Sequence, residues 1–271
     1  MTDRNLKVTV RAGLLGFLIG LFPVFSVLAD ETVSWKLPKR LNEVSGLALS
    51  VDGRVFIHND EKAIVYELDP LTGDISSILK IGDPALRADF EDIALLGEDI
   101  YLITSTGTLH RIENSLNFHE TVAIAEITET GLSDICELEG LSAFRGKLFL
   151  ACKTNFREMD KLQLLVFLFD PIKKTTIEYL RVSHDELDRE KMSPSGIAVT
   201  EEVIYLVSAR QRLLTRVTHG GHLISNHKLK KKQHHQPEGI AVAVSGRLYL
   251  ADEGKGKGGR VTIYESISDI P

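Results

Sequence analysis

The chain has 271 residues, of which 43% are hydrophobic and 26% charged, and its formal net charge at pH 7 is -6. This is an ordinary globular composition, long enough for a large buried core. The chain has no broad basic region, which argues against nucleic acid as a partner.

The first 29 residues carry the pattern of an export signal. Three basic residues precede an almost wholly apolar run over 12–28, and residues 27–29 offer small side chains for cleavage before Asp30. This pattern is typical of a secretory signal peptide. An uncleaved membrane anchor is the alternative, because the apolar run is at the lower limit for a spanning helix. In both cases we expect residues 30–271 to form one exported domain, either periplasmic or membrane-anchored and facing the periplasm.

A short motif then recurs five times: a small or acidic residue, Gly or Asp, a branched apolar residue, and Ala or Ser. It reads Ser45-Gly46-Leu47-Ala48, Glu91-Asp92-Ile93-Ala94, Glu139-Gly140-Leu141-Ser142, Ser195-Gly196-Ile197-Ala198 and Glu238-Gly239-Ile240-Ala241. The steps between the second residues are 46, 48, 56 and 43. A period of roughly 40–50 residues is the signature of a radial or stacked repeat.

Each motif begins a run of predicted strands. A motif strand, a tight turn and a second strand occur over 46–49 and 55–58, 93–96 and 100–103, 141–144 and 147–150, 197–199 and 203–207, and 240–244 and 248–251. Third strands are predicted over 63–68, 108–112, 162–169, 213–217 and 260–264, and fourth strands over 75–81, 121–127, 175–182 and 223–228. The last unit lacks a fourth strand, and a spare one is available over 32–37.

Repeated units of four antiparallel strands predict an all-β fold, a five-bladed β-propeller whose ring is closed by the N-terminal strand. Closure removes the exposed sheet edges that promote aggregation. A six-bladed propeller is the alternative within this class. A two-sheet sandwich would not explain the regular recurrence of the motif.

The chain has two cysteines, Cys136 and Cys152. An oxidising compartment permits a disulfide. In a regular hairpin turning at Arg145-Gly146, however, the two lie three residues out of register, which is roughly 10 Å at about 3.3 Å per residue. We therefore expect two buried free thiols.

The first motif position in each blade begins the strand that lines the central channel. Three of these positions hold carboxylates, so Glu91, Glu139 and Glu238 should converge at one mouth of the channel. Converging carboxylates repel each other and need a cation, a shared proton or water. Ca²⁺ takes several oxygen ligands in flexible geometry, and no His or Cys recurs beside the motif to favour zinc. We predict a Ca²⁺ site with these three ligands, although each Glu alone could instead bond backbone amides.

Further polar residues at the motif starts and at the ends of the second strands should shape a pocket around the ion. The candidates are Glu43, Ser45, Asp60, Lys153, Ser195, Arg210 and Asp252. The basic run over 227–235 is interpreted as a solvated loop, with weak attraction to anionic lipid or polysaccharide as the functional alternative.

The order of the five motifs resembles that of the SdiA-regulated (YjiK-like) family of exported bacterial proteins. The matching stretches are 41–48, 89–94, 139–142, 194–198 and 236–241. A single Glu-Gly-Ile-Ala is also similar to NHL-type and lactonase propellers. The resemblance implies a five-bladed propeller with a calcium site. It carries Glu91, Glu139 and Glu238 over as ligands, and Asp92 adds a carboxylate where other blades have Gly.

Two functions are compatible with this reading. The first is a calcium-binding module at the cell envelope, with an unidentified ligand or envelope protein as partner. The alternative is a metal-dependent hydrolase, lactonase-like or esterase-like, in which the cation polarises a carbonyl at the channel mouth. The motif lacks an adjacent His base for that chemistry. We expect a monomer that contacts a membrane only through an uncleaved N-terminal segment.

Overall fold

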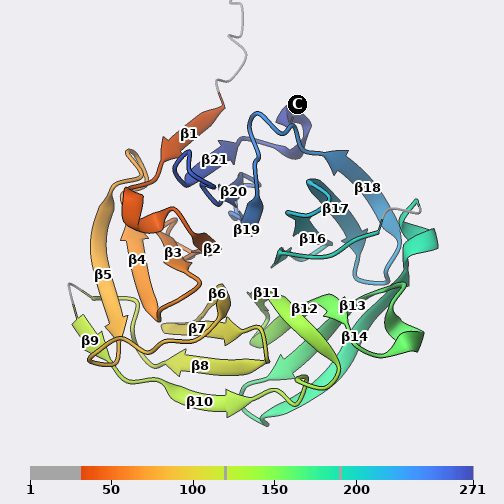
Figure 1. The fold of residues 1–271 in the computed structure, drawn as a ribbon, viewed down its shortest axis with the longest axis horizontal. Coiled ribbons are helices and arrows are strands. Elements are labelled where there is room, and N and C mark those ends of the chain that lie inside the picture. Colours follow the sequence, from red (N-terminus) through yellow and green to blue (C-terminus); the bar gives the residue numbers. More distant parts are fainter. Residues whose placement is uncertain (1–31, 119–120, 189–190, 271) are drawn as a thin grey trace, which may run out of the picture. The chain divides into compact units, whose positions relative to one another are not determined.

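The computed structural model describes residues 32–118, 121–188 and 191–270, so the predicted export signal at 1–29 lies outside the described residues. From Thr32 onward the chain forms one compact unit. Its described strands form five sheets around a centre, and β2, β6, β11 and β19 lie innermost (Figure 1). None of the described helices is long and apolar enough to cross a membrane.

Each sheet is one blade, built on four antiparallel strands. The first contains β2 (Val44–Leu49), β3 (Val55–Asn59), β4 (Ile64–Leu68) and β5 (Ile75–Ile81). The second contains β6 (Phe90–Leu96), β7 (Asp99–Thr104), β8 (Thr108–Ile112) and β10 (Glu126–Glu129). The third contains β11 (Cys136–Phe144), β12 (Lys147–Asn155), β13 (Gln163–Asp170) and β14 (Thr175–Ser183). The fourth contains β15 (Gly196–Val199), β16 (Val203–Ser208), β17 (Leu213–Thr218) and β18 (Leu223–Lys228).

The fifth blade joins the two ends of the chain. It contains β19 (Pro237–Val242), β20 (Leu248–Asp252) and β21 (Arg260–Tyr264), and β1 (Val33–Lys36) supplies its outer strand. β1 runs antiparallel to β21, with Trp35 opposite Val261. The predicted closure of a five-bladed ring by the N-terminal strand is therefore confirmed.

The predicted fourth strand over 121–127 is wrong in one respect. The structure divides it into β9 (Thr121–Ala123), which pairs in parallel with β5 of the first blade, and β10, which pairs with β8. Without β9, β5 would be the outer edge of the first blade, with unpaired backbone groups that another strand can bond. The first blade thus gains a fifth strand from the connection that leads to β10.

The core lies between the blades. Among the described residues, the buried apolar side chains form five clusters, and each cluster joins two neighbouring blades. The motif glycines permit this close packing. A Cβ on Gly196 would lie 2.5 Å from the Glu238 carbonyl oxygen, and one on Gly239 would lie 2.9 Å from the Leu47 nitrogen. The recurring Gly is explained by the passage of one inner strand against the next.

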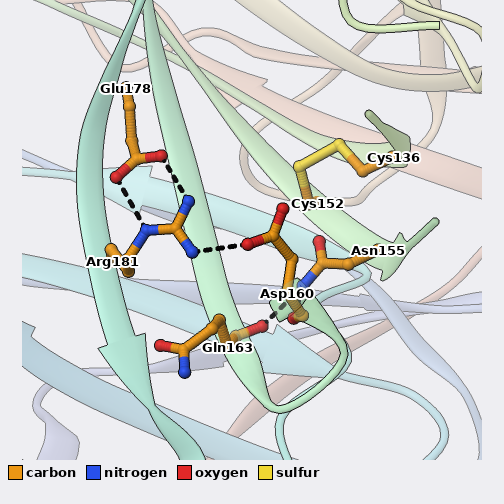
Figure 2. The surroundings of a disulfide bond; sticks show 7 residues. All are labelled: Cys136, Cys152, Asn155, Asp160, Gln163, Glu178 and Arg181. Carbon is orange, nitrogen blue, oxygen red and sulfur yellow. Dashed lines mark hydrogen bonds and ion pairs between the residues drawn. A yellow bond between two sulfur atoms is a disulfide. The ribbon is translucent and has the colours of Figure 1, made fainter. Parts of the chain in front are cut away.

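The expectation of free thiols is also wrong, because Cys136 and Cys152 form a disulfide with their Cα atoms 5.7 Å apart (Figure 2). The prediction assumed a regular ladder between β11 and β12. The real ladder has two register shifts, so Leu138 pairs with Cys152 and the cysteines are offset by two positions. Bulges also bend the strand, which brings the two residues within bonding distance.

Removing this disulfide should destabilise the third blade. The cross-link spans 16 residues, and closing a loop of that length stabilises a protein by about 3 kcal/mol. We expect the double variant Cys136→Ser/Cys152→Ser to lose that amount in denaturant unfolding. A reductant should produce the same loss in the wild-type protein and none in the variant. Equal unfolding midpoints for variant and wild type would contradict the assignment.

Candidate functional site

The three predicted glutamates share one pocket at the mouth of the ring. This acidic pocket has a volume of about 240 Å³. Its described charged lining consists of one cation, Lys153, and seven carboxyl groups: Glu43, Asp60, Asp89, Glu91, Glu139, Glu238 and Glu253. Since these carboxyls come from four of the five blades, the pocket depends on closure of the whole ring.

β-Bulges aim the motif residues at this mouth. In four blades, the ladder between the inner strand and its neighbour skips one residue of the inner strand. The skipped residues are Ser45, Glu91, Glu139 and Glu238. A bulged residue leaves the regular alternation of the strand, and its side chain is redirected. All four skipped residues line the acidic pocket, so the recurring motif is also a recurring bulge.

A matching bulge on β12 places Lys153 beside Glu139. The ladder runs from Cys152 to Thr154 and skips Lys153. Its ammonium forms an ion pair with Glu139, which is 4% exposed, and lies 4.0 Å from Glu137 Oε1. The one cation of the pocket is therefore held by the most buried of the three predicted ligands.

The other two predicted ligands resist ionisation. Burial raises the pKa of Glu91 to about 8, and the negative charge of Asp89 adds to the rise. Burial likewise raises the pKa of Glu238 to about 7, although the amide of Gln236 opposes the rise. The charge of Lys153 lowers both pKa values, but they stay above the ordinary value of 4.5. Both carboxyls therefore bind protons near neutral pH when no other cation is present.

The oxygen atoms that line the acidic pocket are of the chemical type that a hard cation binds. Carboxylate and amide oxygens are the ligands that Ca²⁺ prefers. Asp60 Oδ1 and Gln236 Oε1 are buried and have no hydrogen-bond partner in the described structure, and both residues line the pocket. Within residues 32–118, 121–188 and 191–270, however, no three His, Cys, Asp or Glu side chains are already arranged to hold a metal.

The remaining predicted pocket residues separate into three groups. Glu43, Ser45 and Asp60 line the acidic pocket. Ser195 and Arg210 line an adjoining cavity of about 370 Å³, which also contains Lys153, Glu139 and Glu238. Asp252 is in neither, since it is buried within the fifth blade.

Asp252 and Ser195 have structural partners. Asp252 Oδ2 lies 2.7 Å from His234 Nδ1, and His234 Nε2 lies 2.7 Å from the Tyr264 hydroxyl. All three side chains are buried, so the prediction that Asp252 faces the pocket is wrong. Ser195 donates to the Pro237 carbonyl at 2.7 Å and accepts from the Ala209 amide at 3.0 Å. It therefore ties the fourth blade to the fifth.

The sequence analysis missed Asp89, Gln236 and Glu253. Asp89 and Gln236 each precede a motif glutamate by two positions, as Glu43 precedes Ser45. A search for polar residues at this spacing would have found them, because alternate strand residues share a face. Glu253 directly follows Asp252, and the chain turns out of β20 between these two residues. The sequence does not show which of the two adjacent acids faces inward.

The fold and the site define a β-propeller with an acidic channel mouth. The family model of the SdiA-regulated proteins matches residues 31–255, so the chain belongs to the SdiA-regulated family. A comparison with the sequences of curated proteins finds no match.

Solved structures with the same fold are distant in sequence. Glutaminyl cyclase from Myxococcus xanthus is 16% identical with a TM-score of 0.60, and the match covers 86% of this chain and 94% of that one. The PQQ-bound aldose sugar dehydrogenase from Streptomyces coelicolor is 14% identical, with a TM-score of 0.53 and coverage of 87% and 98%. A gluconolactonase from Xanthomonas campestris is 11% identical, with a TM-score of 0.53 and coverage of 88% and 77%. At these identities the likeness shows the fold alone.

Proposed function

We propose that the chain is an exported binding module that holds Ca²⁺ in the acidic pocket and presents the adjoining polar cavity to a ligand or envelope partner. One observation carries the proposal. Three bulges direct Glu91, Glu139 and Glu238 into a pocket with seven carboxyls and one ammonium. Four blades contribute carboxyls to it, so an ion there would cross-link the ring.

The electrostatics support a divalent cation. Each buried carboxyl that ionises next to another raises the energy of the pocket, and a nearby cation offsets that cost. Ca²⁺ would replace the protons on Glu91 and Glu238 and compete with Lys153 for Glu139. The ammonium has an alternative partner in Glu137, whose Oε1 is 4.0 Å away. Ca²⁺ binding should therefore release protons and shift Lys153 toward Glu137.

Export is supported by two independent features. Residues 1–29 carry a signal-peptide pattern. The chain also contains a disulfide between Cys136 and Cys152, and disulfides persist mainly in oxidising compartments. A periplasmic or envelope-facing location would give the pocket access to free Ca²⁺.

Calorimetric titration with Ca²⁺ tests the proposal. We expect one ion per chain, and Glu91→Gln or Glu238→Gln should weaken binding by at least about tenfold, which corresponds to 1.4 kcal/mol. Glu98→Gln is the matched control, since Glu98 is exposed in the turn between β6 and β7. No Ca²⁺ binding by the wild type, or an equal loss in the control, would contradict the proposal.

A turnover screen distinguishes the binding module from the hydrolase that the sequence left open. The purified protein is assayed against lactones and aryl esters with Ca²⁺ and with chelator. A binding module should give no turnover and a melting temperature sensitive to chelator. Ca²⁺-dependent turnover that Glu139→Gln abolishes would overturn the binding-only function.

Removing the resident cation should strengthen Ca²⁺ binding. Lys153→Met deletes the ammonium that pairs with Glu139 and leaves its apolar stem in place. With the competing charge removed, we expect Ca²⁺ affinity to rise by at least about tenfold. Lys255→Met, in the neighbouring cavity only, should change the affinity less. A Lys153→Met variant that binds Ca²⁺ more weakly than the wild type would contradict the competition.

A further inference from the structure

A third cavity borders the acidic pocket at Lys153 and has the opposite charge. This basic cavity has a volume of about 210 Å³. Four cations line it, namely Lys153, Lys161, Lys191 and Arg210, and its described lining includes no carboxylate. Lys153 also lines the acidic pocket, so the two sites share one wall. A concentration of four cations is unexpected in a protein with a net charge of -6.

Two of the four cations of this cavity, Lys191 and Arg210, have no carboxylate partner among the described residues, while Lys153 pairs with Glu139. Arg181 bonds Asp160 Oδ1 at 2.6 Å and Glu178 Oε2 at 2.6 Å, so it engages both acids (Figure 2). Lys161 pairs with the exposed Glu158. In the described part of the chain, Arg210 and Lys191 form no ion pair. Their mutual repulsion favours an anion between them.

One wall of the cavity is fixed by side-chain bonds. Asn155 lines the cavity, and its Nδ2 donates to the carbonyl oxygens of Asp160 and Gln163, at 2.7 Å each (Figure 2). The same strand, β12, carries the disulfide to Cys136. A wall held in this way needs little ordering when a ligand binds.

His184 adds a hydrogen-bonding group to the cavity, which it lines, and is 8% exposed. Burial lowers the pKa of His184 and the charge of Lys191 lowers it further, while a backbone hydrogen bond with Met192 and the charge of Asp185 oppose them. The neutral ring keeps one N–H donor. Neither ring nitrogen makes a well-formed hydrogen bond among the described residues, so a ligand oxygen can accept from the ring N–H in place of the Met192 backbone.

We propose that the basic cavity binds a small oxyanion, the phosphate or carboxylate group of a ligand, with Arg210, Lys191 and Lys161 supplying the positive charge. The guanidinium of Arg210 can hold two oxygens at once. The site shares Lys153 with the proposed Ca²⁺ site, but anion binding does not require Ca²⁺. Because the two share Lys153, a ligand larger than the oxyanion could extend from the basic cavity toward the acidic pocket.

Titration of the purified protein with inorganic phosphate, in chelator and at low salt, tests this site. Succinate is titrated separately, so that phosphate and carboxylate recognition are distinguished. We expect saturable binding of at least one probe, weakened at least about tenfold by Arg210→Gln and by a smaller factor in Lys161→Gln. Lys173 lies in the exposed turn between β13 and β14 of the third blade. The control variant Lys173→Gln should therefore bind the anion as the wild type does. If neither probe binds, or if Arg210→Gln binds as tightly as Lys173→Gln, the proposal is overturned.

Histidine NMR resonances locate the bound anion independently of affinity. The ring signals of His184 should move during the titration. Those of His219 should not, because its nitrogens already lie 2.7 Å from the Tyr179 hydroxyl and 2.9 Å from the Thr200 carbonyl oxygen. Saturable binding with no movement at His184 would place the anion elsewhere and overturn the assignment.

Discussion

Without added cation, the free energy of unfolding should fall by roughly 2–3 kcal/mol between pH 6.5 and 8.5, and saturating Ca²⁺ should suppress most of that fall. Glu91 and Glu238 carry the effect. Their folded-state pKa values are about 8 and about 7, above the ordinary value of 4.5. The folded state then binds more protons than the unfolded state. The stability is present below the unfolded pKa and is lost as pH rises through the folded pKa.

The pH window keeps the contribution of His58 small. Burial lowers the pKa of His58 to about 4, so His58 makes the protein more stable as pH rises through 4 to its ordinary value of 6.5. Above pH 6.5 only about 0.4 kcal/mol of this opposing effect remains, and the carboxyls dominate. Asp92, whose pKa burial raises well above normal, contributes in the same direction as Glu91 but lies outside the pocket. A part of the fall should therefore persist with Ca²⁺.

Thermal unfolding at several pH values measures this prediction. For a protein of this size, the expected loss corresponds to a decrease of about 5–10 °C in melting temperature. Glu91→Gln should flatten the apo curve, while Glu98→Gln should reproduce the wild-type curve. An apo stability that rises between pH 6.5 and 8.5, or a fall that Ca²⁺ leaves unchanged, would contradict the charge balance inferred for the pocket.

Asp92→Ala should destabilise the protein by about 3 kcal/mol. Asp92 stands where four other motifs have Gly, and it is 1% exposed. Its Oδ2 accepts the Leu141 amide hydrogen at 2.7 Å and its Oδ1 accepts that of Ile93 at 2.8 Å. It therefore bonds the second blade to the third. Alanine would leave the two amides of Leu141 and Ile93 without this acceptor. It would also leave a cavity beside Gly46, whose added Cβ would lie 2.6 Å from Asp92 Oδ1.

Asp92→Asn separates the shape of this side chain from its charge. The asparagine Nδ2 cannot accept a hydrogen bond, so one of the two amide hydrogens, that of Leu141 or that of Ile93, loses its acceptor. Because the side chain keeps its shape and its other acceptor, we expect a loss of about 1–2 kcal/mol, smaller than that of Asp92→Ala. Denaturant unfolding of both variants measures the difference, and Ca²⁺ affinity should stay unchanged in Asp92→Asn. A loss of Ca²⁺ binding in that variant would make Asp92 a ligand and contradict its structural role.

The repeat made most of the ring predictable from sequence. Period and turn residues located the strands, and the missing fourth strand of the last blade predicted the partner of β21. The assignment of 121–127 failed because two blade edges compete for that segment, and pairing to β5 or β8 is decided by tertiary packing. Prediction of the cysteine pair failed because a bulge changes the register by one residue, a shift that propensities and periodicity do not show.

The part of the candidate site that could be predicted from sequence is the part that lies at the starts of the inner strands. Glu91, Glu139 and Glu238 could be found because each begins an inner strand, and the ring brings such positions together. Asp252 was misplaced because it is the last residue of β20, where its side chain turns into the blade toward His234. The basic cavity was not predicted, because Arg210 was expected beside the ion, and Lys161 and His184 come from connections that share no motif.

Anomalous diffraction from crystals grown with Ca²⁺ tests the central claim most directly. The account predicts one anomalous peak in the acidic pocket, bound by carboxylate oxygens of Glu91 and Glu238, with the Lys153 ammonium withdrawn from Glu139. A pocket with no peak at saturating Ca²⁺, and with Lys153 still paired to Glu139, would contradict it.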